Sequence, residues 1–263
     1  MAATHLVLGI DSAWTANNPS GVCLAETDGH CAKCRLVGPS YDQFIEGCEA
    51  TPVDWSRQPS GGELDVPRLL KAIQKRFGMR PTVVAVDMPL SLERITSRRQ
   101  ADNKISSEFG SRHCSTHSPG PTRPGPISDR LTSEFQIAGY HLRTSESGQP
   151  NSLLEVYPHV SILKLMDLPD RYLYKLGKKD RSGLSKPDRI QRAIQNFEAL
   201  QDHLERDLGP LGFSLPTDSH TFSSLKRYED ALDSAVCAWT AVQYLREACR
   251  GVGDETAAIW IPR

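Results

Sequence analysis

Two short apolar segments that each end in an aspartate constrain the fold of this chain most strongly. Residues 5–11, HLVLGID, and 82–90, TVVAVDMPL, include nearly continuous apolar runs rich in β-branched residues. That pattern is typical of strands covered on both faces inside a sheet. The two runs end at Asp11 and Asp87, so each predicted strand places a carboxylate at its end.

The sequence between these two segments predicts an antiparallel meander. Residues 20–26, SGVCLAE, and 32–38, AKCRLVG, have the composition of strands, and the turn TDGH separates them. Together with the first strand they would form three sequential strands at the start of the sheet.

A helix is predicted before the second apolar segment. The stretch VPRLLKAIQKRFG, residues 66–78, has helical periodicity, with Pro67 suited to its first turn and Gly78 to its end. A right-handed parallel crossover through this helix would place the fourth strand beside the first. Asp11 and Asp87 would then be neighbours.

The rest of the chain is predicted to elaborate one core. A length of 263 residues suits a single α/β domain spanning 1–263. Residues from about 93 to 150 are polar or rich in Pro and Gly, and those from about 165 to 220 contain a basic loop and a long helix, so both stretches are interpreted as insertions. The segment AAIWIP near the C-terminus is a candidate edge strand. We expect an α/β fold with a mixed five-stranded central sheet flanked by helices and an inserted helical and loop region.

Composition gives no global sign of a polyanion or membrane partner. Lys and Arg number 31 against 32 Asp and Glu, a net charge of −1. No stretch approaches the roughly 18 apolar residues of a membrane span, and no export signal is recognisable, so we expect no membrane partner. Seven cysteines without such a signal favour reduced thiols and a cytoplasmic location.

A second pair of carboxylates lies in a predicted core helix. In KRYEDALDSAVCAW, residues 226–239, Asp230 and Asp233 lie along the margin of a wide apolar arc and point near the packed interface. The alternative is that they are ordinary acids of a first helical turn, which the helix dipole favours by about 0.3–1 kcal/mol.

Taken together, the four aspartates predict a metal site. Burying an unpaired strand-end charge costs several kcal/mol, and two carboxylates about 4 Å apart repel by about 4 kcal/mol at an effective dielectric of about 20. A divalent cation reverses that sign. Oxygen ligands from remote segments, with room for water and a phosphate, indicate Mg²⁺ or Mn²⁺. Phosphodiester cleavage by two such ions would explain why several carboxylates are present.

Five segments resemble one known family, and they follow its order. They are GIDSAWTANNPSGVCLAE, VVAVDMPLSL, RRQADNKISSEFGSR, LLEVYPH and YEDALDSAVCAWTA. Over most of its length the chain is similar to the domain of unknown function 429 family, ribonuclease H-like proteins predicted to be nucleases. The arrangement is also similar to that of Holliday junction resolvases.

The resemblance implies a ribonuclease H-like fold and assigns roles to several residues. The implied metal ligands, which are also the implied catalytic carboxylates, are four aspartates: Asp11, Asp87, Asp230 and Asp233. Glu155 of EVYPH is implied as a further catalytic residue, beside the metal or orienting the substrate. Arg99 and Asp102 of RRQAD are implied to line the cleft and bind substrate.

The basic segment YKLGKKDRSGLSKPDR contains six candidate phosphate contacts, Lys175, Lys178, Lys179, Arg181, Lys186 and Arg189. Lys178, Lys179 and Arg181 lie in a Gly-bearing loop that precedes a helix start, and both features suit phosphate oxygens. The alternative is a solvated surface with no binding role.

Cysteine and histidine pairs offer a different metal hypothesis. Cys31 and Cys34 form a C-x-x-C pair, and HCSTH supplies His113, Cys114 and His117. No second C-x-x-C is present, so free thiols are the preferred interpretation and zinc the alternative.

The sequence thus predicts a nuclease that uses Mg²⁺ or Mn²⁺, in two-ion form, to hydrolyse DNA or RNA. One alternative is a phosphotransferase of the actin and sugar-kinase type, whose first strand also ends in an aspartate, although no Gly-rich phosphate loop is recognisable. A second alternative is a non-catalytic binding or regulatory module that uses the acids in caps and Arg pairs.

Overall fold

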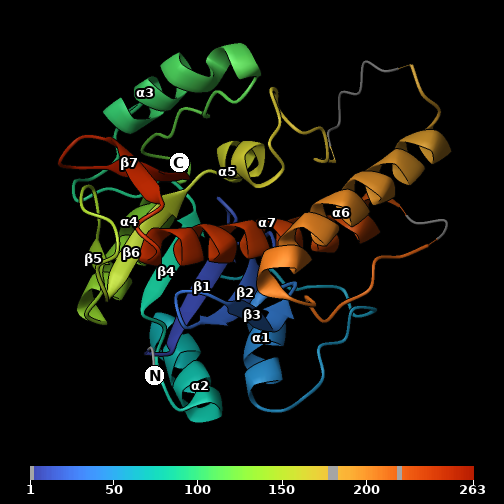
Figure 1. Cartoon of the computed structure of the whole chain (residues 1–263), viewed down its shortest axis with the longest axis horizontal. Helices are drawn as coiled ribbons and strands as arrows, with labels where there is room; N and C mark the ends of the chain where they lie inside the picture. The colour runs from blue at the N-terminus through green and yellow to red at the C-terminus, as the bar shows by residue number, and fades with distance from the viewer. Residues whose placement is uncertain (1–2, 177–182, 218–220) are drawn as a thin grey trace.

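A mixed sheet of eight strands forms the centre of the described part of the chain (Figure 1). The computed structural model describes residues 3–176, 183–217 and 221–263. The strands are β1 (His5–Asp11), β2 (Gly21–Thr27), β3 (Ala32–Gly38), β4 (Val83–Asp87), β5 (His141–Leu142), β6 (Ser152–Val156), β7 (Cys249–Gly253) and β8 (Ala258–Pro262). Their order is β3-β2-β1-β4-β6-β8-β7, with β5 paired to β6.

The first half of the sheet confirms the predicted arrangement. β1, β2 and β3 form an antiparallel meander, and β4 pairs with β1 in parallel. The register makes Asp11 the partner of Gly21 on β2 and of Asp87 on β4. The right-handed crossover assumed for the sequence therefore gives the correct neighbours.

The predicted number of five strands was too small. β8, expected as a possible edge strand, lies inside the sheet between β6 and β7. β7 has the sequence CRGVG, whose glycines give little strand signal, and β5 is only two residues long. Both strands form because β8 and β6 supply a paired edge for them.

Seven α-helices lie within the described ranges. They are α1 (Tyr41–Cys48), α2 (Val66–Phe77), α3 (Gln100–Phe109), α4 (Pro126–Ile137), α5 (Pro158–Leu165), α6 (Lys186–Leu208) and α7 (Phe222–Leu245). α2 confirms its prediction: Asp65 caps it by accepting from the N–H of Arg68, and Gly78 ends it in the left-handed region. None of these helices is long and apolar enough to cross a membrane.

The helices cover the sheet on two sides (Figure 1). Leu6, Leu8 and Ile10 of β1 face one side and pack in a core with α1, α2 and α4. Val7, from the alternate face of the same strand, packs in a core formed with α6 and α7. A smaller cluster joins α3 and α5 to β7 and β8.

Two glycines allow α7 to lie directly on the strands. A Cβ added to Gly9 of β1 would lie 2.1 Å from the carbonyl oxygen of Ser234, and one added to Gly21 of β2 would lie 2.1 Å from that of Asp230. Both atoms belong to the α7 backbone, which cannot move aside as a flexible side chain does. The helix therefore approaches β1 and β2 as closely as their backbones allow.

We expect Gly9→Ala to lower the free energy of unfolding by about 3 kcal/mol or more, because the added methyl group overpacks a backbone contact. Urea unfolding monitored by circular dichroism measures the loss. Gly62→Ala is the matched control, since a Cβ at Gly62 meets nothing within 4 Å. A Gly9→Ala variant as stable as the Gly62→Ala variant would contradict the close packing of α7.

Candidate active site

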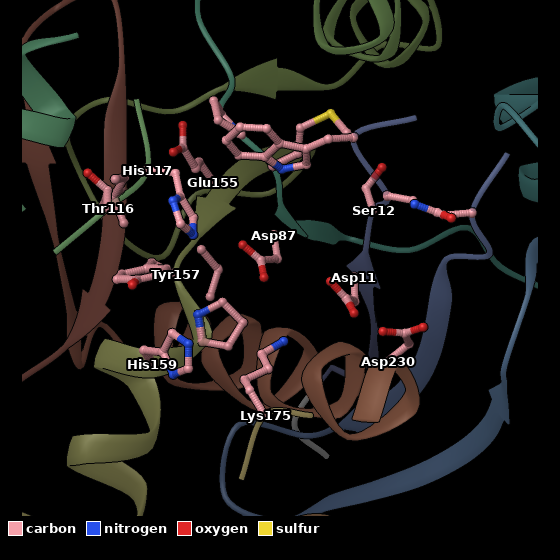
Figure 2. A pocket seen from close by; sticks show the side chains of 18 of the residues that line it. Asp11, Ser12, Asp87, Thr116, His117, Glu155, Tyr157, His159, Lys175 and Asp230 are labelled. Atoms are coloured by element: carbon pink, nitrogen blue, oxygen red, sulfur yellow. The ribbon is translucent and has the colours of Figure 1, made fainter. Parts of the chain in front are cut away.

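Asp11 and Asp87 lie at the carboxyl ends of two adjacent parallel strands, where they are register partners. Both line a cavity of ≈ 710 Å³ (Figure 2). This volume falls within the range of about 300–1,000 Å³ that is typical of small-ligand pockets. The prediction that the two aspartates are neighbours is confirmed.

Helix α7 brings Asp230 to the same cavity. Its backbone carbonyl packs against Gly21, and Gly21 is the register partner of Asp11. The helix begins at Phe222, so Asp230 and Asp233 lie beyond its first two turns. The first-turn explanation of these acids is therefore wrong, because the effect of the helix dipole fades within the first turn.

Burial makes the cavity carboxylates reluctant to ionise. It raises the pKa of Asp11 to about 7, although Lys175 opposes the shift. It also raises the pKa of Asp87 well above the ordinary value, and the negative charge of Asp11 adds to that effect. The pKa of Asp230 is raised by burial against the pull of Lys226. A bound cation would favour the ionised form of all three groups.

Two lysines partly balance the acids of α7. The ammonium group of Lys226 donates to Asp230 and, at 2.7 Å, to Glu229. The ammonium group of Lys175 donates to Asp233 and lies 3.6 Å from Glu229. Burial alone would raise the pKa of Glu229, but the two lysines lower it. Glu229 is therefore a charged member of the cluster.

Asp233 is buried and does not line the cavity. Its carboxylate is fully buried and accepts hydrogen bonds from the hydroxyl of Tyr174 and the ammonium of Lys175. Burial raises the pKa of Asp233 to about 6. The structure thus brings all four predicted aspartates together but gives Asp233 protein partners of its own.

Glu229 is a functional candidate that the sequence analysis missed. It precedes Asp233 by four positions, so both side chains lie on one face of α7. It also accepts a hydrogen bond of 2.6 Å from the N–H of Leu176, which ties the segment after α5 to the helix. The spacing of four residues between Glu229 and Asp233 was the feature of the sequence that could have identified it.

Glu155, Arg99 and Asp102 form a buried ion-pair network. Both oxygens of Glu155 are bound by Arg99, at 2.5 and 2.7 Å, and one also accepts from the N–H of Leu90 at 2.7 Å. Arg99 donates to Asp102 at 2.9 Å from the start of α3. Burial raises the pKa of Glu155 although Arg99 opposes the shift. Glu155 and Asp102 line the cavity and Arg99 does not, and the charged atoms of all three are already paired with one another.

The predicted phosphate-binding residues Lys178, Lys179 and Arg181 lie outside the described residues. Within the described part, the cavity lining includes Lys175 and Arg171 from the preceding segment. Lys175 belongs to the basic loop that the sequence singled out, whereas Arg171 precedes that loop and was not predicted.

Aromatic and histidine side chains complete the cavity wall, and most were not predicted. Arg123 stacks over Trp14 with 5.7 Å between the guanidinium carbon and the ring centroid. Trp14 also meets His117 edge-on. Nε2 of His159, in the EVYPH motif, lies 2.7 Å from Nη2 of Arg171. Burial lowers the pKa of His159 well below the ordinary value.

The cysteine and histidine pairs do not converge on one centre. Sγ of Cys34 is buried 4.0 Å from Sγ of Cys23, whereas Cys31 is exposed. Across residues 3–176, 183–217 and 221–263, no group of three or more His, Cys, Asp or Glu side chains is already arranged to hold a metal ion. In the acidic cluster, the ammonium groups of Lys175 and Lys226 lie among the carboxylates.

The fold and this cavity define a mixed α/β protein with an acidic site at the carboxyl edge of its sheet. The chain belongs to the family described as Protein of unknown function (DUF429), whose model matches residues 9–258. The family resemblance inferred from the five segments is confirmed. Comparison with curated proteins and with solved structures gave no match.

We expect Arg99→Met to lower the free energy of unfolding by about 3–5 kcal/mol, because Glu155 and Asp102 would remain buried without a counter-charge. Arg68→Met is the control: it breaks an ion pair with Asp42 whose side chains are 55% and 51% exposed, and should cost less than about 1 kcal/mol. Urea unfolding at neutral pH compares them. Equal losses would show that the Arg99 network is not a buried structural unit.

We expect Asp11→Asn to stabilise the protein at about pH 8 in the presence of a chelator. The pKa of Asp11 is about 7 in the folded protein and near 3.8 ordinarily, so the folded state binds the proton more tightly and ionisation opposes folding as pH rises. The advantage of the variant should grow from pH 4 to pH 7 and reach up to about 4 kcal/mol.

Unfolding curves across this pH range measure that advantage. Asp42→Asn on α1 serves as the control, because Asp42 lies at the surface in an exposed ion pair. If Asp11→Asn were no more stable than the natural protein at pH 8, burial would not raise the pKa of Asp11 as described above.

Proposed function

We propose that this protein is a cytoplasmic nuclease of ribonuclease H-like fold that hydrolyses phosphodiester bonds of DNA or RNA with the help of Mg²⁺ or Mn²⁺. The observation that supports this most is the meeting of Asp11, Asp87 and Asp230 beside an open cavity of ≈ 710 Å³. Ligands of open α/β sheets generally bind outside the carboxyl ends of the strands. Lys175 and Arg171 add positive charge for phosphate oxygens next to these acids.

The direction and order of five strands support the proposed fold. β3, β2 and β1 run antiparallel in sequence, and β4 and β6 continue the sheet in parallel with β1. α7 covers one face of these strands and supplies its acid at the carboxyl ends of β1 and β4. β5, β7 and β8 are then additions to that five-stranded core.

The donor type of the site, carboxylate oxygen, suits a hard divalent cation, although no three such side chains of the described residues are already arranged to hold one. Among the described residues, Asp11 and Asp87 have no lysine or arginine within ion-pair distance, and Asp230 has only Lys226, whose side chain is 49% exposed. These three aspartates would hold the ion, since Mg²⁺ and Mn²⁺ prefer carboxylate oxygens. Glu155 and Asp233 fit less well as ligands, because protein donors already engage their oxygens.

The ion, when bound, would supply an activated water and stabilise the departing oxygen. In the hydrolysis the water oxygen forms a bond to phosphorus and the bond from phosphorus to the leaving sugar oxygen breaks. The water gives up a proton, and the leaving oxygen gains one. The protein binds the strand for this step: Arg171 can pair with non-bridging phosphate oxygens, and Trp14 offers a ring on which a base can stack.

We expect purified protein with Mg²⁺ or Mn²⁺ to cleave labelled nucleic acid, and Asp11→Asn to lose that cleavage by at least about 100-fold without loss of fold. The panel would contain single-stranded and duplex DNA and RNA and a four-way DNA junction, which identifies the substrate class. Asp42→Asn is the matched control for the loss of one acidic charge. Circular dichroism verifies the fold of each variant.

Metal binding can be tested without activity. Millimolar Mg²⁺ should raise the melting temperature of the natural protein by mass action and leave that of Asp11→Asn nearly unchanged. Full activity in Asp11→Asn would remove this residue from the mechanism. Failure of Mg²⁺ and Mn²⁺ to bind at all would favour the non-catalytic binding module, and ATP binding without an effect of nucleic acid would favour the phosphotransferase.

A further inference from the structure

Arg171 is a cavity residue whose positive charge has no acidic partner in the described part of the chain. It lies in the segment between α5 and α6 and lines the cavity. Within residues 3–176, 183–217 and 221–263, its guanidinium makes no ion pair, and its one hydrogen bond joins Nη2 to Nε2 of His159 at 2.7 Å. Most of the N–H donors of this guanidinium therefore remain for a ligand.

His159 holds the guanidinium as a neutral acceptor. A guanidinium only donates, so Nε2 of His159 accepts through its lone pair and the ring proton lies on Nδ1. Burial lowers the pKa of His159 well below the ordinary value, and the charges of Lys175 and Arg171 add to that effect, so the ring stays neutral. Arg99, by contrast, is bound by two carboxylates. Arg171 is thus held in place while its full charge is retained.

The ring of His159 is fixed by packing. It meets Tyr157 and Tyr174 edge-on, with ring centroids 5.4 and 5.6 Å away. Its Nδ1 is buried and has no hydrogen-bond partner among the described residues. An unpaired buried donor works against folding. Stability of the fold therefore does not explain a histidine at this position, whereas its contact with Arg171 does.

The backbone around Arg171 is also held. The N–H of Arg171 donates to the carbonyl oxygen of Arg112 at 3.1 Å. The guanidinium of Arg112 donates in return to the carbonyl oxygen of Pro169 at 2.5 Å and to that of Leu168. These bonds fix the start of the Arg171 side chain and His159 fixes its end, so less side-chain freedom is lost when a ligand binds.

His159 places this arginine on the β6 side of the cavity, the side formed by the residues that follow β6. β6 pairs in parallel with β4, which ends at Asp87. Figure 2 shows His159 and Tyr157 on the side of the cavity away from Asp11 and Asp230. An anionic group bound by Arg171 would therefore lie apart from the acids of β1 and α7.

The size and lining of the cavity indicate which polyanion fits. A volume of ≈ 710 Å³ is that of a small-ligand pocket, which suits one strand better than a duplex. The ring of Trp14 also lines the cavity. A base can stack on such a ring only where the base is not already stacked in a duplex.

We propose that Arg171, held by His159, binds a phosphate of a single, unpaired nucleic-acid strand on the β6 side of the cavity. This inference rests on the proposed nuclease function and narrows its substrate to an unpaired strand. Arg171 is the residue that touches the phosphate. His159 is a positioning residue that acts through Arg171.

Binding measured in a chelator tests this subsite without metal or cleavage. The probes are fluorescein-labelled oligothymidylate and oligouridylate of about twelve nucleotides, read by fluorescence anisotropy. We expect Arg171→Met to raise Kd by about 10-fold, the scale for one hydrogen bond to a charged group. It should also lower the slope of log affinity against log salt by about 0.7, the value for one lost phosphate contact. Arg68→Met, which removes an exposed charge of α2, is the matched control and should leave both quantities nearly unchanged.

A double-mutant cycle tests the role of His159. His159→Phe keeps an aromatic ring but removes the acceptor, so Kd should rise by about 5-fold. In the Arg171→Met background the same change should have no further effect, because the partner of His159 is absent. His159→Gln restores an acceptor near the position of Nε2 and should recover part of the affinity. Losses that multiply in the double variant would overturn the positioning role.

Circular dichroism verifies the fold of each variant. If the phenylalanine prevented folding by overpacking, His159→Asn would close the cycle, because its shorter side chain leaves no acceptor at the position of Nε2.

The outcomes separate this subsite from the proposed function. No binding of either oligonucleotide, or an unchanged Kd in Arg171→Met, would overturn the subsite even if the protein cleaved another nucleic acid. Tighter binding of a duplex than of its separate strands would overturn the choice of an unpaired strand. Binding that depends on Arg171 and His159, without cleavage in Mg²⁺ or Mn²⁺, would instead overturn the nuclease function and leave the subsite in place.

Discussion

The contact between the backbone of α7 and the strands β1 and β2 determines where the acidic cavity forms. Gly9 and Gly21 leave no room for a Cβ beneath the helix, so helix and sheet approach at backbone distance. Gly21 is also the strand partner of Asp11 and touches the carbonyl of Asp230. The same packing contact therefore holds α7 against the sheet and places Asp230 of the helix near Asp11 of the strand. A longer residue at position 21 would separate them.

This arrangement works against stability. Carboxylates with raised pKa values oppose folding at neutral pH, and each shifted unit corresponds to about 1.4 kcal/mol. The apolar cores on the two sides of the sheet must offset that cost. The cost is large compared with the free energy of unfolding of a typical protein, which is about 5–15 kcal/mol. Lys175 and Lys226 reduce the repulsion without abolishing it. Uncompensated charge facing a cavity is the condition under which a cation or a cationic ligand gains most by binding.

Local sequence patterns were sufficient for the strands β1 to β4 and for helix α2, whereas helix α1 between them was not predicted. The apolar runs that end at Asp11 and Asp87, and the capped helix between them, specify strands, helix and register through short-range rules. β7 could not be predicted in this way, because CRGVG becomes a strand only when β8 provides its partner. The pairing of Glu155 with Arg99 likewise depends on residues 56 positions apart. Sequence alone identified the acids but not which of them already had partners.

Partners, more than residue type, separate the acids into different roles. Glu155 and Asp102 share Arg99 and form a hydrogen-bonded structural unit, as the short distances around the guanidinium indicate. Asp11 and Asp87 belong to the same chemical class and are just as close to the cavity, yet in the described part of the chain neither has a cationic partner within ion-pair distance. A divalent ion would therefore bind least favourably beside Glu155 and Asp102, where arginine already supplies positive charge. It would bind most favourably beside Asp11 and Asp87. The proposed chemistry is therefore assigned to the carboxyl ends of β1 and β4, and the arginine network holds the cavity wall beside them in place.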